Sequence, residues 1–225
     1  MLTKATHTRD GQFGPATGKH WVARVIADCA VRDDTIYDEW LVRDYGGIVR
    51  QMGLDPREYA ASLIAAEGGP QTAKPMFTTA IDVDGDYKGT GNDNAWGAKY
   101  ASIVQRIMDK DFDRAVIGEY AGAKTSIGRE RCLEFWVGLR SSFPNATFKI
   151  HHQIGMDADM LSPRASIRWS LDGSHDGWGS FGAPTGVPVH VFGMSHAEFG
   201  PWGLRREFAL FDEVAIWKQI LMQSA

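Results

Sequence analysis

Asp212, near the end of the chain, has the side-chain type and the setting that acid–base chemistry requires. It follows an apolar stretch and is in phase with Phe208 and Leu210. If these two apolar residues face inward, the Asp212 carboxylate is partly desolvated. Its pKa then rises toward the range useful for proton transfer. Asp212 also stands directly before the apolar segment 213–222, where an aspartate commonly caps a helix. Both roles stay open.

His196 is the second candidate, sixteen residues before Asp212. The segments 186–199 and 203–212 have the pattern of strands, and the GPWG sequence between them suits a hairpin. Antiparallel pairing about this turn is expected to bring His196 and Asp212 onto neighbouring strand ends, far from the hairpin. The alternative is a strand histidine that is exposed or satisfied by local hydrogen bonds.

Large apolar side chains are numerous enough to line a pocket for a fused-ring or extended hydrophobic ligand. His152 alternates with Phe148, Ile150 and Ile154, which places it on the apolar face of a strand, whereas His151 points to the surface. The alternative for each of these residues is a place in the core. The predicted pocket-lining residues are Trp96, Trp136, His152, Trp169, Phe192 and Phe208.

The sequence predicts no metal and no cofactor. Asp82, Asp84 and Asp86 suggest a calcium loop, but the sixth and twelfth positions, which require Gly and Glu, hold Tyr87 and Asp93. The glycine-rich KGTGND segment lacks the Lys–Ser/Thr pair of a phosphate-binding loop. The two cysteines are far apart in the chain and in no metal-like spacing.

Composition excludes several classes of partner. The formal net charge is −4, which does not attract nucleic acid or an anionic membrane. There is no apolar run of about 20 residues that would span a bilayer. The N-terminus lacks the apolar stretch of a signal peptide. We therefore expect a cytoplasmic protein that interacts with neither nucleic acid nor membrane.

An internal repeat sets the expected domain organisation. GQFGPATG at residues 11–18 reappears as GSFGAPTG at residues 179–186, and the offset between them continues without a gap. The two segments are predicted to be copies of one structural unit. Matched positions along them include Phe13 and Phe181, Glu39 and Glu207, Asp44 and Asp212, Ile48 and Ile216, and Gln51 and Gln219.

The second copy is preceded by much more helix and strand than the first. We therefore predict a partial, second-half unit over residues 1–55, a helix and linker over 56–90, and a complete domain over 91–225. A half-sheet with a bare apolar face does not stand alone. Residues 1–55 should thus pack on the complete domain or on a second chain, and we expect a homodimer.

The hydrophobic periodicity of the complete unit predicts helices followed by strands, which is an α+β arrangement. The predicted helices cover residues 92–111, 112–121, 128–142 and 213–222. The predicted strands cover residues 146–155, 163–175, 186–199 and 203–212.

The motifs APTGVPVHVFGMSH and LRREFALFDEVAIWKQI resemble those of SnoaL-like polyketide cyclases, which belong to the NTF2-like superfamily. The half-copy carries the related sequences PATGKHWVARVIAD and IYDEWLVRDYGGIVRQMGLDP. The resemblance implies an NTF2-like cone, a curved antiparallel sheet with helices packed on the concave face. It also implies a cofactor-free acid/base enzyme, of the polyketide cyclase/aldol or isomerase type, that acts on a hydrophobic carbonyl compound. Asp212 and His196 would then be its catalytic residues.

The same fold hosts proteins that only bind, so a non-catalytic small-molecule-binding or assembly protein is the alternative. Asp44 repeats Asp212 in the half-copy, which favours a structural role for both. The sequence also resembles cone-fold epoxide hydrolases, in which an Arg-x-Asp pair acts. Here the pair is Arg168 and Ser170, and the missing aspartate argues against epoxide opening.

Overall fold

The computed structural model describes residues 1–80, 84–107 and 109–223. Its larger sheet has the strand order β5–β4–β9–β8–β7–β6. All neighbouring strands in it are antiparallel except β4 and β9, which are parallel, so the predicted antiparallel sheet is in fact mixed. The strands are β4 (Phe112–Tyr120), β5 (Lys124–Ile127), β6 (Thr147–Met156), β7 (Arg164–Ser174), β8 (Pro188–Gly200) and β9 (Gly203–Phe211).

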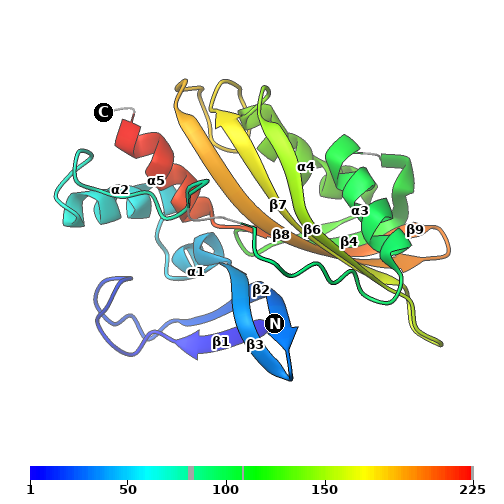
Figure 1. Cartoon of the computed structure of the whole chain (residues 1–225). Helices are drawn as coiled ribbons and strands as arrows, with labels where there is room; N and C mark the ends of the chain where they lie inside the picture. The colour runs from blue at the N-terminus through cyan, green and yellow to red at the C-terminus, as the bar shows by residue number, and fades with distance from the viewer. Residues whose placement is uncertain (81–83, 108, 224–225) are drawn as a thin grey trace.

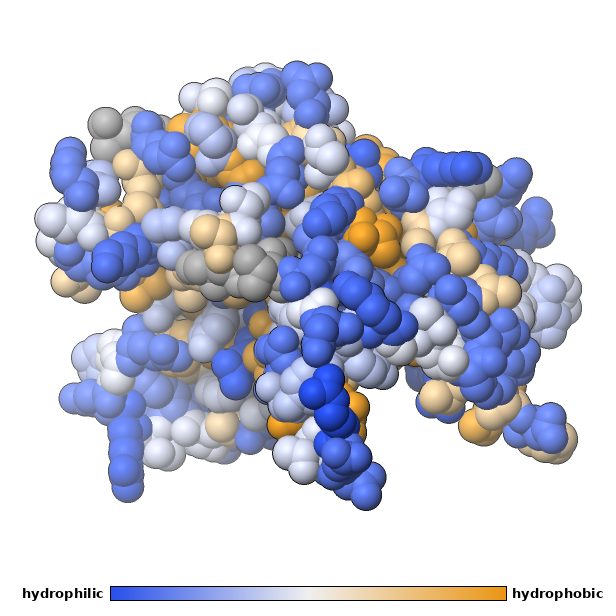
Figure 2. Space-filling model, viewed as in Figure 1, coloured by the Kyte–Doolittle hydropathy of each residue, from blue (hydrophilic) through white to orange (hydrophobic). Residues whose placement is uncertain are grey.

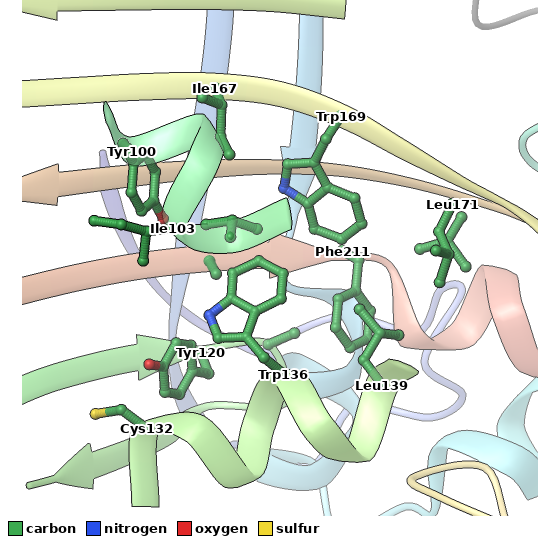
Figure 3. Packing of buried hydrophobic residues seen from close by; sticks show 14 of the residues in the cluster. Tyr100, Ile103, Tyr120, Cys132, Trp136, Leu139, Ile167, Trp169, Leu171 and Phe211 are labelled. Carbon is green, nitrogen blue, oxygen red and sulfur yellow. The ribbon is translucent and has the colours of Figure 1, made fainter. Parts of the chain in front are cut away.

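Two helices, α3 (Asn94–Arg106) and α4 (Arg129–Ser142), cover the concave face of this curved sheet, here called the inner face (Figure 1). The helix α5 (Glu213–Gln223) follows the last strand, and a short 3-10 helix, η1, spans Asp109–Asp111. This is the predicted α+β cone. The cone is filled by side chains: Trp136 of α4 packs on Trp169 of β7, with ring centroids 5.6 Å apart, and both are buried (Figure 3).

The predicted helix over residues 112–121 is wrong, because this segment forms β4. Phe112, Val116 and Tyr120 are buried on its inner side. β4 lies between β9 and β5 in the sheet. Pairing with two strands outweighs the weak helical pattern of a short segment. The following strand, β5, was not predicted.

A second correction concerns β6. The register of β6 against β7 shifts between Ile150 and His152, which marks a bulge. A bulge turns the following side chains to the opposite face. Phe148 and Ile150 therefore pack in the inner core, while His152 lies on the outer face opposite Arg168.

Residues 1–66 form a smaller body, most of which lies on the outer face of the sheet, below it in Figure 1, while residues 56–66 pack beside α5. Its strands are β1 (Leu2–Thr6), β2 (His20–Arg32) and β3 (Thr35–Arg43), in the order β1–β2–β3, and its helices are α1 (Tyr45–Gln51) and α2 (Pro56–Ala66). Ile26 and Val42 of this body pack on Met194 and Leu210 of the large sheet. Of the two packings predicted for residues 1–55, the structure has the one within the chain.

Several hydrogen bonds recur at positions that the internal repeat relates. The Nδ1 atom of His7 lies 3.1 Å from Thr17 Oγ1, and that of His175 lies 3.1 Å from Thr185 Oγ1. The Gln51 side chain bonds both backbone groups of Val22, and the Gln219 side chain bonds both of His190. β2 and β3 also begin and end at the positions that the repeat aligns with the ends of β8 and β9. The division of the chain into a partial and a complete unit stays a prediction.

Polar and charged side chains cover most of the face shown in Figure 2. Among the described helices, none is both long and apolar enough to cross a membrane.

Candidate functional site

Asp212 is buried and caps α5. Its Oδ1 atom accepts hydrogen bonds from the backbone N–H groups of Val214, at 2.9 Å, and Ala215, at 3.1 Å. Burial raises the pKa of Asp212 to about 7, against the lowering effect of these two N–H groups, and the nearby carboxylates of Asp44 and Glu213 raise it further. Asp212 therefore has the helix-capping role that the sequence offered as one of two possibilities. Its carboxyl group also has a pKa near neutral pH.

A cleft of about 500 Å³ opens beside Asp212. It runs along β3 of the small body and is closed on other sides by Phe192 of β8 and by the linker residues Met76 and Phe77. We call it the Asp212 cleft. Its lining residues are Asp38, Glu39, Trp40, Leu41, Arg43, Tyr45, Met76, Phe77, Gly85, Phe192 and Asp212.

His196 lies in a different depression, a recess of about 300 Å³ on the outer face near the hairpin end of the sheet. Burial lowers the pKa of His196 to about 4, and the positively charged N-terminus nearby lowers it further. The imidazole is thus neutral at pH 7. We call this depression the His196 recess. Its lining residues are Ile154, Met156, Arg164, Ala165, Ser166, His196, Ala197, Glu198 and Phe208.

The structure does not bring His196 and Asp212 together. His196 pairs with Phe208, and the hairpin turn follows Gly200, so His196 lies toward the hairpin end. Asp212 lies beyond Phe211, at the opposite end of β9. Four strand residues at about 3.3 Å each separate the row of His196 from Asp212 by about 13 Å. The predicted pairing at strand ends is therefore wrong, because only Asp212 lies far from the hairpin.

The six predicted pocket residues do not line one pocket. Trp136 and Trp169 are fully buried core residues, and Trp96 packs at the edge of that core with its ring centroid 4.9 Å from that of Phe199. Phe192 lines the Asp212 cleft and Phe208 the His196 recess. β8 and β9 turn Phe192 and Phe208 to the outer face, where the small body covers part of the sheet.

His152, the sixth predicted pocket residue, belongs to a polar network between the sheet and the small body. Its Nδ1 lies 2.8 Å from an oxygen of Asp28, which also accepts a hydrogen bond of 3.0 Å from Arg168 Nε. The hydrogen bond to Asp28 raises the pKa of His152. The two hydrogen bonds hold the pKa of Asp28 below its usual value, although burial alone would raise it. The network joins β2 to the large sheet and accounts for the burial of Arg168.

Contacts with the linker correct the prediction for His151 and explain the role of the acidic loop residues Asp84 and Asp86. The His151 side chain is 5% exposed, not a surface group, because it bonds Asp84 and Ser170 at 2.8 and 2.9 Å. Asp86 bonds Tyr37 and Arg32. The acidic loop residues thus hold the linker against the two bodies. Asp82 lies outside the described residues.

Sequence reasoning missed Glu207, the carboxylate inside the cone. Glu207 is completely buried and accepts hydrogen bonds from Tyr100, Tyr120 and Trp136 at 2.8, 2.6 and 3.0 Å. Burial raises its pKa, while the three donors oppose that shift. The signal was its phase with Ala209 and Phe211, which marks position 207 as inward-facing.

No family model matches the sequence, and no curated protein matches it. Among solved structures, a proposed SnoaL-like polyketide cyclase from Jannaschia sp. CCS1 is 16% identical over 57% of this chain and 84% of that chain, with a TM-score of 0.43. A protein of ketosteroid isomerase-like fold from Catenulispora acidiphila, in complex with trimethylamine, is 14% identical over 58% and 92%, with a TM-score of 0.41. AclR from Streptomyces galilaeus, a proposed hydroxylase, is 13% identical over 53% and 87%, with a TM-score of 0.42. Matches at such identities and TM-scores do not establish an activity.

Proposed function

We propose that this protein binds a small, largely apolar molecule that carries one hydrogen-bonding group, such as a hydrophobic carbonyl compound, in the His196 recess. The observation that carries the proposal is the His196 imidazole itself. Among the described residues it has no hydrogen-bond partner, and it lines a recess with mostly apolar walls. A neutral imidazole offers one N–H donor, which a carbonyl oxygen requires, and one acceptor nitrogen, which a hydroxyl group can also use.

The walls of the recess suit this ligand. Ile154, Met156 and Phe208 supply apolar surface, and the recess is at the lower end of the size range of small-molecule sites. Arg164 and Glu198 lie opposite each other on β7 and β8 and line the recess, and Ser166 supplies a hydroxyl group. Apolar walls with a few polar groups bind the body of a ligand and fix its orientation.

The cone interior is a less suitable ligand site than the His196 recess. Trp136, Trp169 and Tyr100 occupy it, and Glu207 already accepts hydrogen bonds from three donors. A ligand in that space would have to displace packed aromatic rings, which costs several kcal/mol for each large side chain moved. The open recess requires no such change.

Native mass spectrometry after gentle purification should reveal a retained ligand. Titration with 2-tetralone, an apolar bicyclic ketone, then tests the site. We expect His196→Phe, which fills space but removes both ring nitrogens, to weaken binding at least fivefold, because one hydrogen bond of about 1 kcal/mol is lost. His20→Phe, at an exposed position of β2, is the matched control. Equal affinity of the two variants would contradict the proposal.

A second candidate is acid–base catalysis in the Asp212 cleft, and one observation favours it. The pKa of Asp212, about 7, lets the carboxyl group both take and return a proton near neutral pH. Exchange of the α-hydrogens of 2-tetralone with heavy water, followed by NMR, would detect such chemistry. Exchange that is faster than in buffer and absent from Asp212→Asn would support it. Identical rates in the two proteins would exclude this role.

A further inference from the structure

One edge of β3 has no neighbouring strand among the described residues, whereas the corresponding edge of β9 is paired. β3 lies at the end of the order β1–β2–β3. β9, its counterpart in the internal repeat, lies between β8 and β4. β4 pairs in parallel with Arg206, Glu207, Phe208 and Ala209, which the repeat aligns with Asp38, Glu39, Trp40 and Leu41. These last four residues all line the Asp212 cleft.

Where the pairing of β4 with β9 ends, the turn after β4 makes hydrogen bonds to a carboxylate. The backbone N–H of Ala121 donates to Ala209 of β9. The next two N–H groups, of Gly122 and Ala123, donate to the two carboxylate oxygens of Asp44, at 2.7 and 2.8 Å. Asp44 also caps α1 through Gly47. One carboxylate thus caps the start of a helix and accepts two hydrogen bonds from a tight turn at the same time.

Asp212 is the counterpart of Asp44 in the repeat, and it has the helix-cap contacts but, among the described residues, not the contacts from a turn. Both of its hydrogen bonds from described residues come from α5 and reach Oδ1. Asp212 lies at the end of the cleft that runs along the β3 edge. β4 and its turn thus join a strand edge of one copy, that of β9, to the carboxylate of the other copy, Asp44. The cleft brings together the two matching parts, the edge of β3 and the carboxylate of Asp212.

The backbone of β3 faces this cleft with groups suited to strand pairing. Since Ala209 accepts from the turn after β4, the matching Leu41 carbonyl points to the free edge, and so do the N–H and C=O groups of Glu39, two residues away. The Glu39 N–H bonds the side chain of Asp38, its own neighbour. A local side chain thus covers an edge group, as is common on unpaired strands.

We propose that the free edge of β3 and the Asp212 carboxylate together form a docking site for a partner polypeptide. The partner adds to β3 as a parallel strand and then turns, so that two consecutive backbone N–H groups donate to Asp212. The chemistry of the occupant is that of residues 112–124 of this chain, a strand of apolar residues that also carries Asp113, Arg114 and Glu119, followed by a glycine-containing turn. Main-chain hydrogen bonds along a sheet edge supply affinity in this mode of recognition.

The test uses a fluorescent peptide with the sequence of residues 112–124 and the full chain, with binding followed by anisotropy. We expect saturable binding, and protection of residues 36–43 from hydrogen exchange. Asp212→Asn keeps an oxygen for the α5 cap but turns an NH2 group toward the peptide, and should weaken binding at least tenfold. A peptide in which an ester oxygen replaces the backbone N–H of Gly122 lacks one of the two donors but keeps the residue free to adopt its φ of +83°. It should bind the wild type more weakly than the unmodified peptide does, and the two peptides should bind Asp212→Asn equally.

Glu39→Pro removes an N–H from the free edge without touching the pairing of β3 with β2, and should abolish binding. Circular dichroism and the thermal midpoint establish that each variant is folded. No saturable binding by the wild type would overturn the proposal, and so would binding that neither variant changes. Self-association of the chain that the peptide does not compete with, or a small molecule that fills the cleft and excludes the peptide, would assign the site to another occupant and overturn it as well.

Discussion

Asp44 and Asp212 hold the same place in two similar parts of the molecule, yet their surroundings differ. Asp44 accepts three backbone hydrogen bonds, two of them from the turn after β4. Asp212 accepts two, both from the helix that it caps, and borders a cleft. The same contrast holds for Glu207, which three donors surround, and Glu39, which is exposed. Residues at aligned positions of the repeat thus contribute differently to stability, because different segments pack beside them.

Among the aligned positions, the largest difference in the effect of substitution on the free energy of unfolding is expected between Glu207 and Glu39. Glu207→Leu leaves the hydroxyl groups of Tyr100 and Tyr120 and the indole N–H of Trp136 buried without an acceptor. We expect a loss of about 3 kcal/mol or more in the free energy of unfolding. Glu39→Leu, at an exposed position, should change it by less than about 0.5 kcal/mol. Urea unfolding followed by tryptophan fluorescence measures both, and a similar loss in the two variants would refute the assigned role of Glu207.

The elements of the complete unit were largely predictable from sequence, and the site was not. The alternation of Ala165, Ile167, Trp169 and Leu171 predicts β7 with the correct face inward, because one strand carries the whole signal. β4 was missed because its identity depends on β9, a strand far away in the chain. The hydrophobic periodicity of a single segment carries no information about its pairing with a distant strand.

The candidate site failed for a related reason. Asp212 was predicted both as a cap and as a desolvated carboxylate, and the structure contains both features. The assumption that Phe208 and Leu210 face the cone interior was wrong, because residues 1–66 cover the outer face and make it apolar too. A strand buried on both faces loses the alternation that tells inside from outside. The bulge in β6 reversed His152 in the same unpredictable way.

An intermediate difference is expected between the two aspartates. Asp44→Asn places an NH2 group against the N–H donors of Gly122, Ala123 or Gly47, and should destabilise the protein by about 2 kcal/mol. Asp212→Asn keeps its cap and meets no further donor among the described residues. At pH 5 we expect this variant to change the free energy of unfolding by less than about 0.5 kcal/mol. Urea unfolding at that pH compares the two variants directly, and a larger loss in Asp212→Asn would reverse the comparison.

The pH dependence of stability provides a further test of the surroundings of Asp212. The pKa of Asp212 is raised from 3.8 to about 7, so the folded chain binds more protons than the unfolded chain within that window. Stability from this group is therefore present below the window and is lost as the pH rises through it. From pH 5 to pH 8 the wild type should lose about 2 to 3 kcal/mol more than Asp212→Asn. Parallel pH profiles of the two proteins would show that Asp212 ionises normally.

The smallest difference between aligned positions is expected at two glycines. Gly18 and Gly186 have φ values of +67° and +74°, and a Cβ atom would meet no atom within 4 Å at either. An alanine at each position therefore costs only backbone strain, about 1 kcal/mol. Since the local geometry is the same, Gly18→Ala and Gly186→Ala should shift the urea unfolding midpoint equally, in a single transition.

This equality depends on the contact between the two bodies, which makes it a test of their coupling. Ile26 and Val42 share a core with Met194 and Leu210, and Asp28 bonds His152 and Arg168 across the same boundary. Losing these contacts exposes apolar surface and separates buried charges, so neither body should unfold alone. If Gly18→Ala instead splits the transition, while Gly186→Ala moves it as a whole, residues 1–66 unfold on their own. The small body would then be an appendage, and the cleft along β3 would open before the cone does.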